Sequence, residues 1–305
     1  MARARRDERT VDTEGALVAQ VRSFNRLVTE RVGALADRFL GRDRPLGESR
    51  LLWEIGEGAV EIRQLRDRLA LDSAYVSRML RSLERQRLVA VKESVRDGRV
   101  RRVQLTRAGR AERAALNHLA DEFARSLLRP LAEDQRTRLT AAMAEVERLL
   151  LASMVTITVA EPTSAAATWC LERYFAELDA RFPTGFDPGL SIPADAHELA
   201  PPAGVFVIAW LRNQAVGCGA LKLHKGAPAE LKRMWLAPSA RGLGLGRRLL
   251  MELEHFAKEA GAAVIHLWTN RTLTEAIALY RRSGYREVPA FNDERYAHHW
   301  FEKRL

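Results

Sequence analysis

The chain has 305 residues, more than one hydrophobic core usually holds, so its length predicts two domains. No apolar run reaches the roughly 20 residues that cross a bilayer. The charged start MARARRDERT is unlike a secretory signal, so we expect a cytoplasmic protein with no membrane partner. Two cysteines, Cys170 and Cys218, are too few for a disulfide framework. Residues 1–150 hold 31 basic and 23 acidic side chains, against 18 and 16 in the remainder, and this basic excess indicates that the first half meets a polyanion.

The first half is predicted to be mostly helical, with one hairpin. Apolar residues recur at helical spacing, and the expected helices lie near 12–40, 48–56, 61–69, 73–86, 107–128 and 131–152. Strand-like runs at 88–91 and 100–105 flank an Asp-Gly pair, which predicts a hairpin turn. This order of helix, turn, helix and hairpin is typical of a winged helix-turn-helix domain.

The pattern changes at Met154 to strands that alternate with helices, so we place the domains at 1–153 and 154–305. The expected strands begin at 154 and lie near 204–211, 215–224, 229–236, 262–269, 285 and 296–304. The expected helices lie near 163–180, 243–260 and 273–282. Such alternation predicts an α/β domain after the mostly α first domain.

The segment 72–85 fits a helix that reads DNA. Asp72 suits the N-cap, and Val76, Leu80 and Leu83 share one apolar face. Another face carries Ser77, Arg78, Arg81 and Arg85, which also suit a merely solvated surface. Arginines at the tip of the hairpin can enter a narrow minor groove. The predicted DNA-contacting residues are Ser73, Tyr75, Ser77, Arg78, Arg81, Arg96, Asp97 and Arg99.

Residues 12–152 resemble the MarR family of transcriptional regulators, through VSRMLRSLE, the wing sequence Asp97-Gly98-Arg99 and VQLTRAGR. The resemblance implies a homodimer formed by the terminal helices and a double-stranded DNA operator, with one recognition helix per half-site. It implies that Arg99 enters the minor groove while Asp97 helps to hold the wing. The family usually has glycine where Arg87 stands, at a left-handed helix C-cap, so Arg87 is expected to cost up to about 1 kcal/mol there.

The segment Arg241-Gly242-Leu243-Gly244-Leu245-Gly246 joins an apolar strand to an amphipathic helix. Such a turn exposes backbone N–H groups at a helix N-terminus, which favours a diphosphate. A triphosphate-binding P-loop requires Gly-Lys-Ser/Thr, but Arg247 and Arg248 follow here. A dinucleotide fingerprint requires G-x-G-x-x-G and a later acidic residue, whereas the spacing here is G-x-G-x-G and 262–267 contains no acid.

The loop matches the R/Q-x-x-G-x-G/A signature of GNAT acetyltransferases, and AELKRMWLAPSARGLGLGRRLL, LWTNRTLTEAIALYRRSGYREV and YAHHWFEKRL extend the resemblance over 154–305. It implies an α/β (α+β) fold with a mixed central sheet whose two central parallel strands splay apart, and acetyl-CoA as the acetyl donor. The implied coenzyme contacts are Met234, Trp235, Leu236, Arg241, Gly242, Leu243, Gly244, Leu245, Gly246, Asn270 and Tyr280. No metal-ligand cluster stands at a useful spacing, so no metal is expected.

Acetyl transfer to an amine requires a base for the amine proton and an acid for the leaving thiolate. Glu230 stands where the family often has a carboxylate, and Tyr280 where it has its tyrosine acid, so they are the predicted base and acid. A strand N–H near Trp235 would polarise the thioester carbonyl. Arg181 or Arg212 would bind a carboxylate of the acceptor, which favours an amino acid or a related small molecule.

The sequence therefore predicts a bifunctional protein, a DNA-binding regulator and an N-acetyltransferase acting on a primary amine of a small molecule. Two alternatives stay open at this point. The second domain is a catalytically silent acyl-CoA sensor that tunes DNA binding, or its acceptor is a protein lysine.

Overall fold

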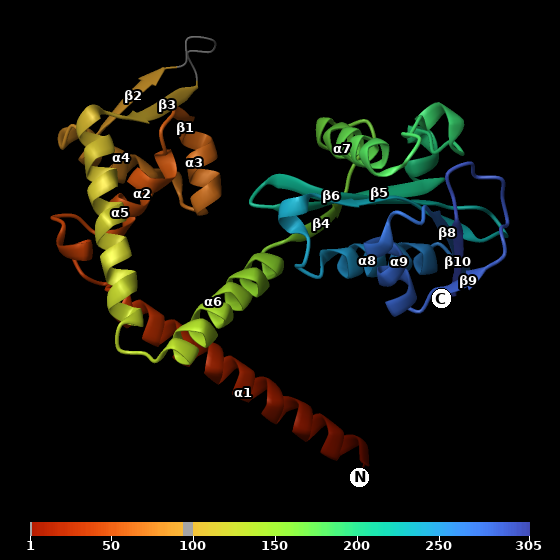
Figure 1. Cartoon of the computed structure of the whole chain (residues 1–305), viewed down its shortest axis with the longest axis horizontal. Helices are drawn as coiled ribbons and strands as arrows, with labels where there is room; N and C mark the ends of the chain where they lie inside the picture. The colour runs from red at the N-terminus through yellow and green to blue at the C-terminus, as the bar shows by residue number, and fades with distance from the viewer. Residues whose placement is uncertain (1, 94–99) are drawn as a thin grey trace. The chain divides into compact units, whose positions relative to one another are not determined.

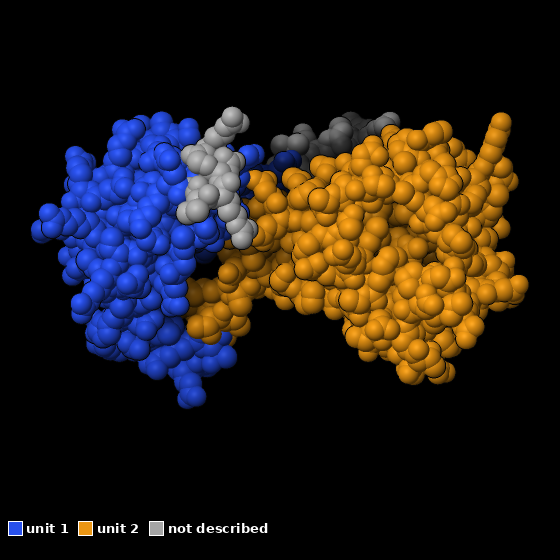
Figure 2. All heavy atoms as spheres, turned by 90° about the horizontal axis from the view of Figure 1, so that it is seen from above, with its two compact units in different colours: residues 1–137 blue, residues 138–305 orange. Residues whose placement is uncertain are grey.

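The computed structural model describes residues 2–93 and 100–305, with side chains from Glu14 onward, and it divides the chain into compact units of residues 1–137 and 138–305 (Figures 1 and 2). Arg96, Asp97 and Arg99 lie outside the described residues. The division falls inside α6 (Glu133–Ser153), whereas the sequence placed the boundary at the end of this helix. Within the described ranges, no helix combines the length and apolarity needed to cross a membrane.

The first unit is a winged helix-turn-helix, as predicted. Its elements are α1 (Ala2–Arg31), a 3-10 turn (Phe39–Gly41), α2 (Leu46–Ile55), β1 (Val60–Glu61), α3 (Ile62–Leu69), α4 (Ser73–Arg85), β2 (Val89–Glu93), β3 (Arg101–Leu105) and α5 (Arg107–Leu128). The strands form an antiparallel sheet in the order β1-β3-β2. The core is closed by fully buried side chains from both helices and strands, including Leu52, Leu65, Leu83, Val103 and Leu116.

Local signals set most boundaries in this unit. The Asp72 carboxylate accepts from the Tyr75 N–H at 2.8 Å, so the predicted N-cap of α4 is confirmed. The long first helix was wrongly bounded: it begins at Ala2 and ends at Arg31, before the left-handed Gly33, rather than running over 12–40. Apolar spacing alone continues past Gly33, so periodicity could not locate that end.

The second unit is a mixed sheet between helices. Its elements after α6 are β4 (Thr156–Val159), α7 (Ala165–Arg181), 3-10 turns (Pro188–Leu190, Ala196–Leu199 and Pro238–Ala240), β5 (Gly204–Leu211), β6 (Gln214–Lys222), β7 (Ala229–Leu236), α8 (Leu245–Glu259), β8 (Val264–Thr269), α9 (Thr274–Arg282), β9 (Arg286–Val288) and β10 (His299–Arg304). The strand order is β4-β5-β6-β7-β8-β10-β9. The predicted α/β architecture with a mixed sheet is confirmed.

Both faces of the sheet are covered, by α7 on one side and by α8 and α9 on the other (Figure 1). On β5, Val205 and Val207 pack with the α8 side while Phe206 and Ile208 pack with the α7 side. This arrangement explains why the strand is apolar without alternation, since successive side chains point to opposite buried faces.

Strands β7 and β8 are the one parallel pair in the described sheet, and they pair only at their first residues. Ala229 is opposite Ile265 and Glu230 is opposite His266, and no register continues beyond them. All other described pairings are antiparallel. The β8-facing edge of β7 is therefore left unpaired toward Leu236, in agreement with the predicted splay.

The end of α4 allows a test of local strain. Arg87 has a left-handed backbone conformation, with φ 58°. The Leu88 N–H donates to the Leu83 carbonyl at 2.9 Å, and the Arg87 N–H donates to the Glu84 carbonyl at 2.8 Å. These two bonds form a Schellman C-cap.

Arg87→Gly should raise the free energy of unfolding by about 0.5–1 kcal/mol, measured by urea denaturation, because glycine enters this conformation without a Cβ clash. Arg85→Gly, inside the helix, should lower it by about 1 kcal/mol. Destabilisation by both substitutions would contradict the strain at Arg87.

Candidate functional site

A cavity of about 500 Å³ opens where β7 separates from β8. We call it the coenzyme cavity. It is bounded by α7, the end of β7, the glycine-rich loop, the start of α8 and α9. Its lining includes Tyr174, Glu177, Arg181, Met234, Trp235, Leu236, Arg241, Gly242, Gly244, Leu245, Gly246, Arg247, Glu275, Tyr280 and Arg282. Of the predicted coenzyme contacts, only Leu243 and Asn270 are absent from this lining.

Glycine stands at three positions of the loop for different physical reasons. Gly242 and Gly244 have φ of 76° and 72°, with open space where a Cβ would be, so they are required by backbone conformation. Gly246 is favoured by packing, since a Cβ there would lie 3.2 Å from the Leu279 side chain of α9, which would have to shift slightly. Helix α8 begins at Leu245 and no side chain caps it, which leaves the N–H groups of its first turn available to an anion.

The basic side chains around the loop are not equivalent. Arg241 donates to the Glu177 carboxylate and to the Leu236 carbonyl, so its guanidinium is already engaged. Burial raises the pKa of Glu177, but hydrogen bonds from Trp235, Arg241 and Arg181 outweigh this effect and hold the pKa below its ordinary value. Arg247 and Arg282 also line the coenzyme cavity, and no described carboxylate lies within ion-pair distance of them. Sequence reasoning did not assign either one.

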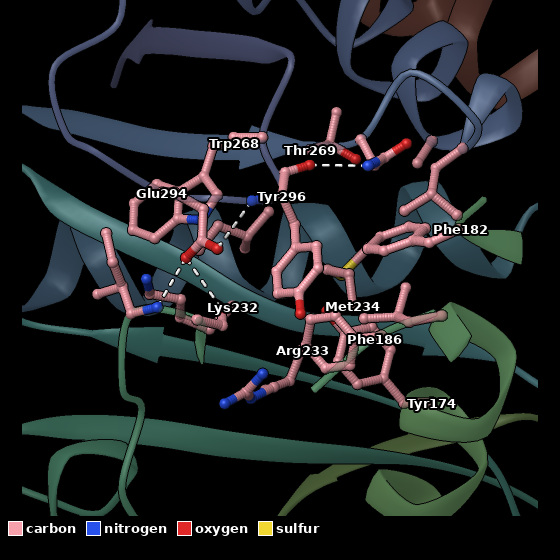
Figure 3. A pocket seen from close by; sticks show the side chains of 18 of the residues that line it. Tyr174, Phe182, Phe186, Lys232, Arg233, Met234, Trp268, Thr269, Glu294 and Tyr296 are labelled. Atoms are coloured by element: carbon pink, nitrogen blue, oxygen red, sulfur yellow. Dashed lines mark hydrogen bonds between the residues drawn. The ribbon is translucent and has the colours of Figure 1, made fainter. Parts of the chain in front are cut away.

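A second cavity of about 100 Å³ continues from the first (Figure 3). We call it the acceptor cavity. The two cavities share Tyr174, Leu178, Met234, Leu273, Ala276 and Tyr280. The rest of the acceptor lining includes Phe182, Phe186, Ser191, Ile192, Lys232, Arg233, Trp268, Thr269, Asn270, Glu294 and Tyr296. Since an acyl donor and an acceptor must meet, the shared residues mark the place where transfer is geometrically possible.

Tyr280 lies at this junction. Its ring packs against Tyr285 and Phe301, it is only 6% exposed, and no described residue bonds its hydroxyl. Burial raises the pKa of Tyr280 well above its ordinary value, so the phenol stays protonated near neutral pH. An unpaired, protonated hydroxyl on a residue that lines both cavities can donate a proton, which is the role predicted for it.

Glu230 is placed differently from Tyr280. Its carboxylate lies 3.0 Å from Lys232 Nζ and 3.3 Å from His224 Nε2, and it lines neither cavity. Lys232 does line the acceptor cavity, with Nζ 3.3 Å from the centroid of the Trp268 ring. A base role for Glu230 therefore requires a bridging water, and its direct contact is with the Lys232 ammonium.

The side chains of Asn270 and Leu243 interact with other parts of the protein. The Asn270 amide donates to the Tyr296 carbonyl at 2.8 Å, and its oxygen accepts from Thr272 N and Oγ1, both at 3.0 Å. Its side chain lines the acceptor cavity rather than the coenzyme cavity. Leu243 packs against the main core. Both predicted coenzyme contacts thus lie beside the coenzyme cavity without lining it.

Of the two arginines predicted to bind a carboxylate of the acceptor, one is already paired and the other lines neither cavity. Arg181 pairs with Glu177 and Glu275 and donates to the Thr272 carbonyl. Arg212 lies in the turn between β5 and β6 and lines neither cavity. Arg233 lines the acceptor cavity instead, and no periodicity or motif in the sequence points to it. In the described ranges, no group of three or more His, Cys, Asp or Glu side chains is arranged to hold a metal ion.

The predicted DNA-reading face of α4 is solvent-facing. Val76, Leu80 and Leu83 are buried, whereas Arg78, Arg81 and Arg85 are exposed, with no described carboxylate at ion-pair distance. Ser73 and Tyr75 are exposed and Ser77 is half-buried on the same helix, and the Arg78 guanidinium lies 5.8 Å from the Tyr75 ring centroid. These six side chains form an uncompensated basic surface.

Two family profiles match the chain. The profile described as the acetyltransferase (GNAT) family matches residues 171–285, and that of the MarR family matches residues 41–100. N-alpha-acetyltransferase RimI of Mycobacterium tuberculosis is 34% identical over 135 residues, which cover 43% of this chain and 80% of RimI. The IAA acetyltransferase of Azospirillum brasilense is 39% identical over 98 residues, which cover 32% of this chain and 64% of that protein, so the match spans less than two thirds of that relative.

Among solved structures, a probable transcriptional regulator from Pseudomonas aeruginosa is similar to the first unit. It is 25% identical with a TM-score of 0.35, and the alignment covers 40% of this chain and 92% of that one.

The buried lysine of the acceptor cavity allows a test by pH. Burial lowers the pKa of Lys232 from 10.5 to about 8, although Glu230 opposes the shift. Between these values the unfolded chain binds the proton that the folded chain has released, so stability contributed by Lys232 increases as the pH rises. The free energy of unfolding of wild type minus that of Lys232→Met should therefore grow from about pH 8 to about pH 10, measured by urea denaturation.

The exposed lysine Lys225 provides the matched control. The difference between wild type and Lys225→Met should stay flat over the same range, because that ammonium is in water in both states. If the difference in unfolding free energy between wild type and Lys232→Met also stayed constant with pH, the lowered pKa of Lys232 would be refuted.

Proposed function

Because the chain belongs to the GNAT acetyltransferase family and carries a MarR-family domain ahead of it, we propose that it is both a DNA-binding regulator and an N-acetyltransferase for a primary amine of a small molecule. The observation that carries the enzymatic part is the junction of the coenzyme and acceptor cavities at Tyr280. A domain that only binds the coenzyme does not need a second cavity that meets the first at the unpaired hydroxyl of Tyr280.

Acetyl-CoA supplies the activated acetyl group, and the chain supplies its position and the proton transfers. The first-turn amides of α8 and the free guanidinium of Arg247 fit its diphosphate. The unpaired edge of β7, ending at Met234, Trp235 and Leu236, offers backbone groups along the cavity to the pantetheine arm. An N–H near Trp235 would polarise the thioester carbonyl.

Proton movements complete the reaction. The neutral amine nitrogen bonds to the carbonyl carbon, the carbon–sulfur bond breaks, and the Tyr280 hydroxyl protonates the leaving sulfur. The proton lost by the amine goes to water leading to Glu230, which Lys232 and His224 hold in place. The products are the N-acetyl amine and free coenzyme A thiol.

Removing one hydroxyl tests this assignment. Tyr280→Phe should lower kcat for thiol release by about 10²-fold or more, with little change in acetyl-CoA affinity, because only the proton donor is lost. Tyr285→Phe is the matched control: this tyrosine is also buried, with a pKa raised by burial, but it lines neither cavity, so kcat should be unchanged.

The same assay separates the alternatives. Tight acetyl-CoA binding with no thiol release on any amine would favour the catalytically silent sensor. Mass spectrometry of the incubated protein would reveal acetylated lysines if the acceptor were a protein lysine.

The proposed regulatory part depends on the basic face of α4. One exposed arginine face on a winged helix-turn-helix fits the major groove. We infer a homodimer because α1 exposes apolar side chains at helical spacing, with Leu17, Val21 and Leu27 each more than half exposed. A solvated monomer would leave this stripe in water, and a second copy would bury it.

Arg81→Ala should weaken binding to double-stranded DNA selected from a random pool by about tenfold and reduce the salt slope, measured by fluorescence anisotropy, because one cation at the DNA surface is lost. Arg99→Ala should act in the same direction. Arg50→Ala is the control, since it removes an equal charge from α2 of the same unit, where Arg50 pairs with Glu54. The complex should contain two chains per DNA by sedimentation. Equal effects of Arg50 and Arg81 would refute docking through α4.

A further inference from the structure

The acceptor cavity carries one positive and one negative side chain that the described protein does not neutralise. Arg233 lines it from β7 and Glu294 from the segment before β10, on different sides in Figure 3. No described carboxylate lies within 4.0 Å of the Arg233 guanidinium, and no described basic group lies within 4.0 Å of the Glu294 carboxylate. The third charge, Lys232, is already paired with Glu230.

Arg233 is held in an unusual backbone conformation. It has φ 55° inside a strand, where β6 and β7 also shift register between Cys218 and Ala220. Its guanidinium lies 4.8 Å from the Phe175 ring centroid and 5.9 Å from that of Tyr174. A left-handed arginine in a strand is retained only where the surroundings impose it, and such outliers concentrate at ligand sites. Contact with these rings leaves in-plane N–H donors for a carboxylate, besides the one that the Tyr174 hydroxyl can accept.

Glu294 offers a fixed negative charge. It is 6% exposed, and its Oε2 accepts from Ser191 Oγ at 2.9 Å and from the Ile192 N–H at 2.8 Å. Oε1 accepts only a longer bond of 3.3 Å from the Tyr296 N–H. Two good bonds fix the carboxylate, and Oε1 keeps capacity for a further donor such as an ammonium.

The remaining wall is aromatic and the space is small. Phe182, Phe186 and Tyr296 pack with ring centroids 4.8 to 5.7 Å apart, and the cavity is about 100 Å³. These rings favour an apolar group and leave no room for a polypeptide. A polyamine would bring a second cation into a site that already holds Arg233.

Resting on the proposed acetyltransferase function, we infer that the acceptor is a small amino acid with an apolar side chain. Arg233 binds its carboxylate, Glu294 binds its ammonium before deprotonation, and the aromatic wall receives the side chain. The amino-acid class was expected from Arg181 or Arg212, but Arg233 is the arginine that the acceptor cavity contains.

Three probes with the same branched four-carbon unit separate the two charges. L-Valine carries both, isobutylamine only the ammonium and isovalerate only the carboxylate. Binding to the full-length protein saturated with coenzyme A is measured by calorimetry. L-Valine should bind at least tenfold more tightly than either partial probe.

Two variants then assign each charge. Arg233→Gln should weaken L-valine and isovalerate at least tenfold and leave isobutylamine unchanged, and Arg233→Lys should restore part of the loss. Glu294→Gln should weaken L-valine and isobutylamine and leave isovalerate unchanged. Arg212→Gln is the control and should change nothing. Uniform loss over all three probes would indicate a merely structural role, and no preference for L-valine in wild type would overturn the inference.

Turnover on the same probes separates this inference from the proposed function. Charge-dependent binding of L-valine without thiol release on any amine would contradict the enzyme and leave the binding site standing. Thiol release with isobutylamine at the same kcat/KM as L-valine, in wild type and in Arg233→Gln, would leave the enzyme standing and refute the amino-acid acceptor.

Discussion

The separation of β7 from β8 after two residue pairs is the constraint on which the site depends. A continued parallel ladder would consume the backbone groups of β7 and close the space between the strands. Instead, the strand turns away through the left-handed Arg233 and the shifted register with β6. Both cavities lie along the gap, one toward the start of α8 and the other toward the aromatic segment after α7, and Met234 and Tyr280 line both.

The two sides of this gap differ in electrostatics. The coenzyme side has free helix amides and two unpaired guanidinium groups, Arg247 and Arg282, as a polyanion requires. The acceptor side balances one cation and one anion around an apolar wall. At the start of the gap, the half-buried Glu230 and the buried Lys232 lie 3.0 Å apart, so each partly offsets the other's charge. Under the inferred amino-acid acceptor, this pairing would reduce competition from Lys232 for the carboxylate and favour Arg233.

Sequence reasoning was strongest where local chemistry determines conformation. The glycine-rich loop, the Asp72 cap and most helix and strand ends follow from residue types a few positions apart, whereas the left-handed conformation at Arg87 was implied only by the MarR resemblance. It was weakest where tertiary packing determines the conformation and position of a residue. Arg233 adopts a conformation that glycine or asparagine would signal, and Glu294 and Tyr296 lie in an irregular segment with no periodicity. Asn270 looked like a ligand, but its amide holds the turn after β8, which only the fold reveals.

The covalent path between the two units runs along α6, and the coenzyme side contacts this helix directly. Arg248, in the first turn of α8, donates to the Ala152 carbonyl of α6 at 2.6 Å and to the Val155 carbonyl at 2.8 Å. The turn that would bind the diphosphate therefore also bonds one carbonyl in the last turn of the connecting helix and one just after it. By thermodynamic linkage, a ligand that stabilises one arrangement of this contact is bound more tightly by that arrangement. Arg248 thus joins the turn that we assign to the diphosphate with the end of α6 through hydrogen bonds.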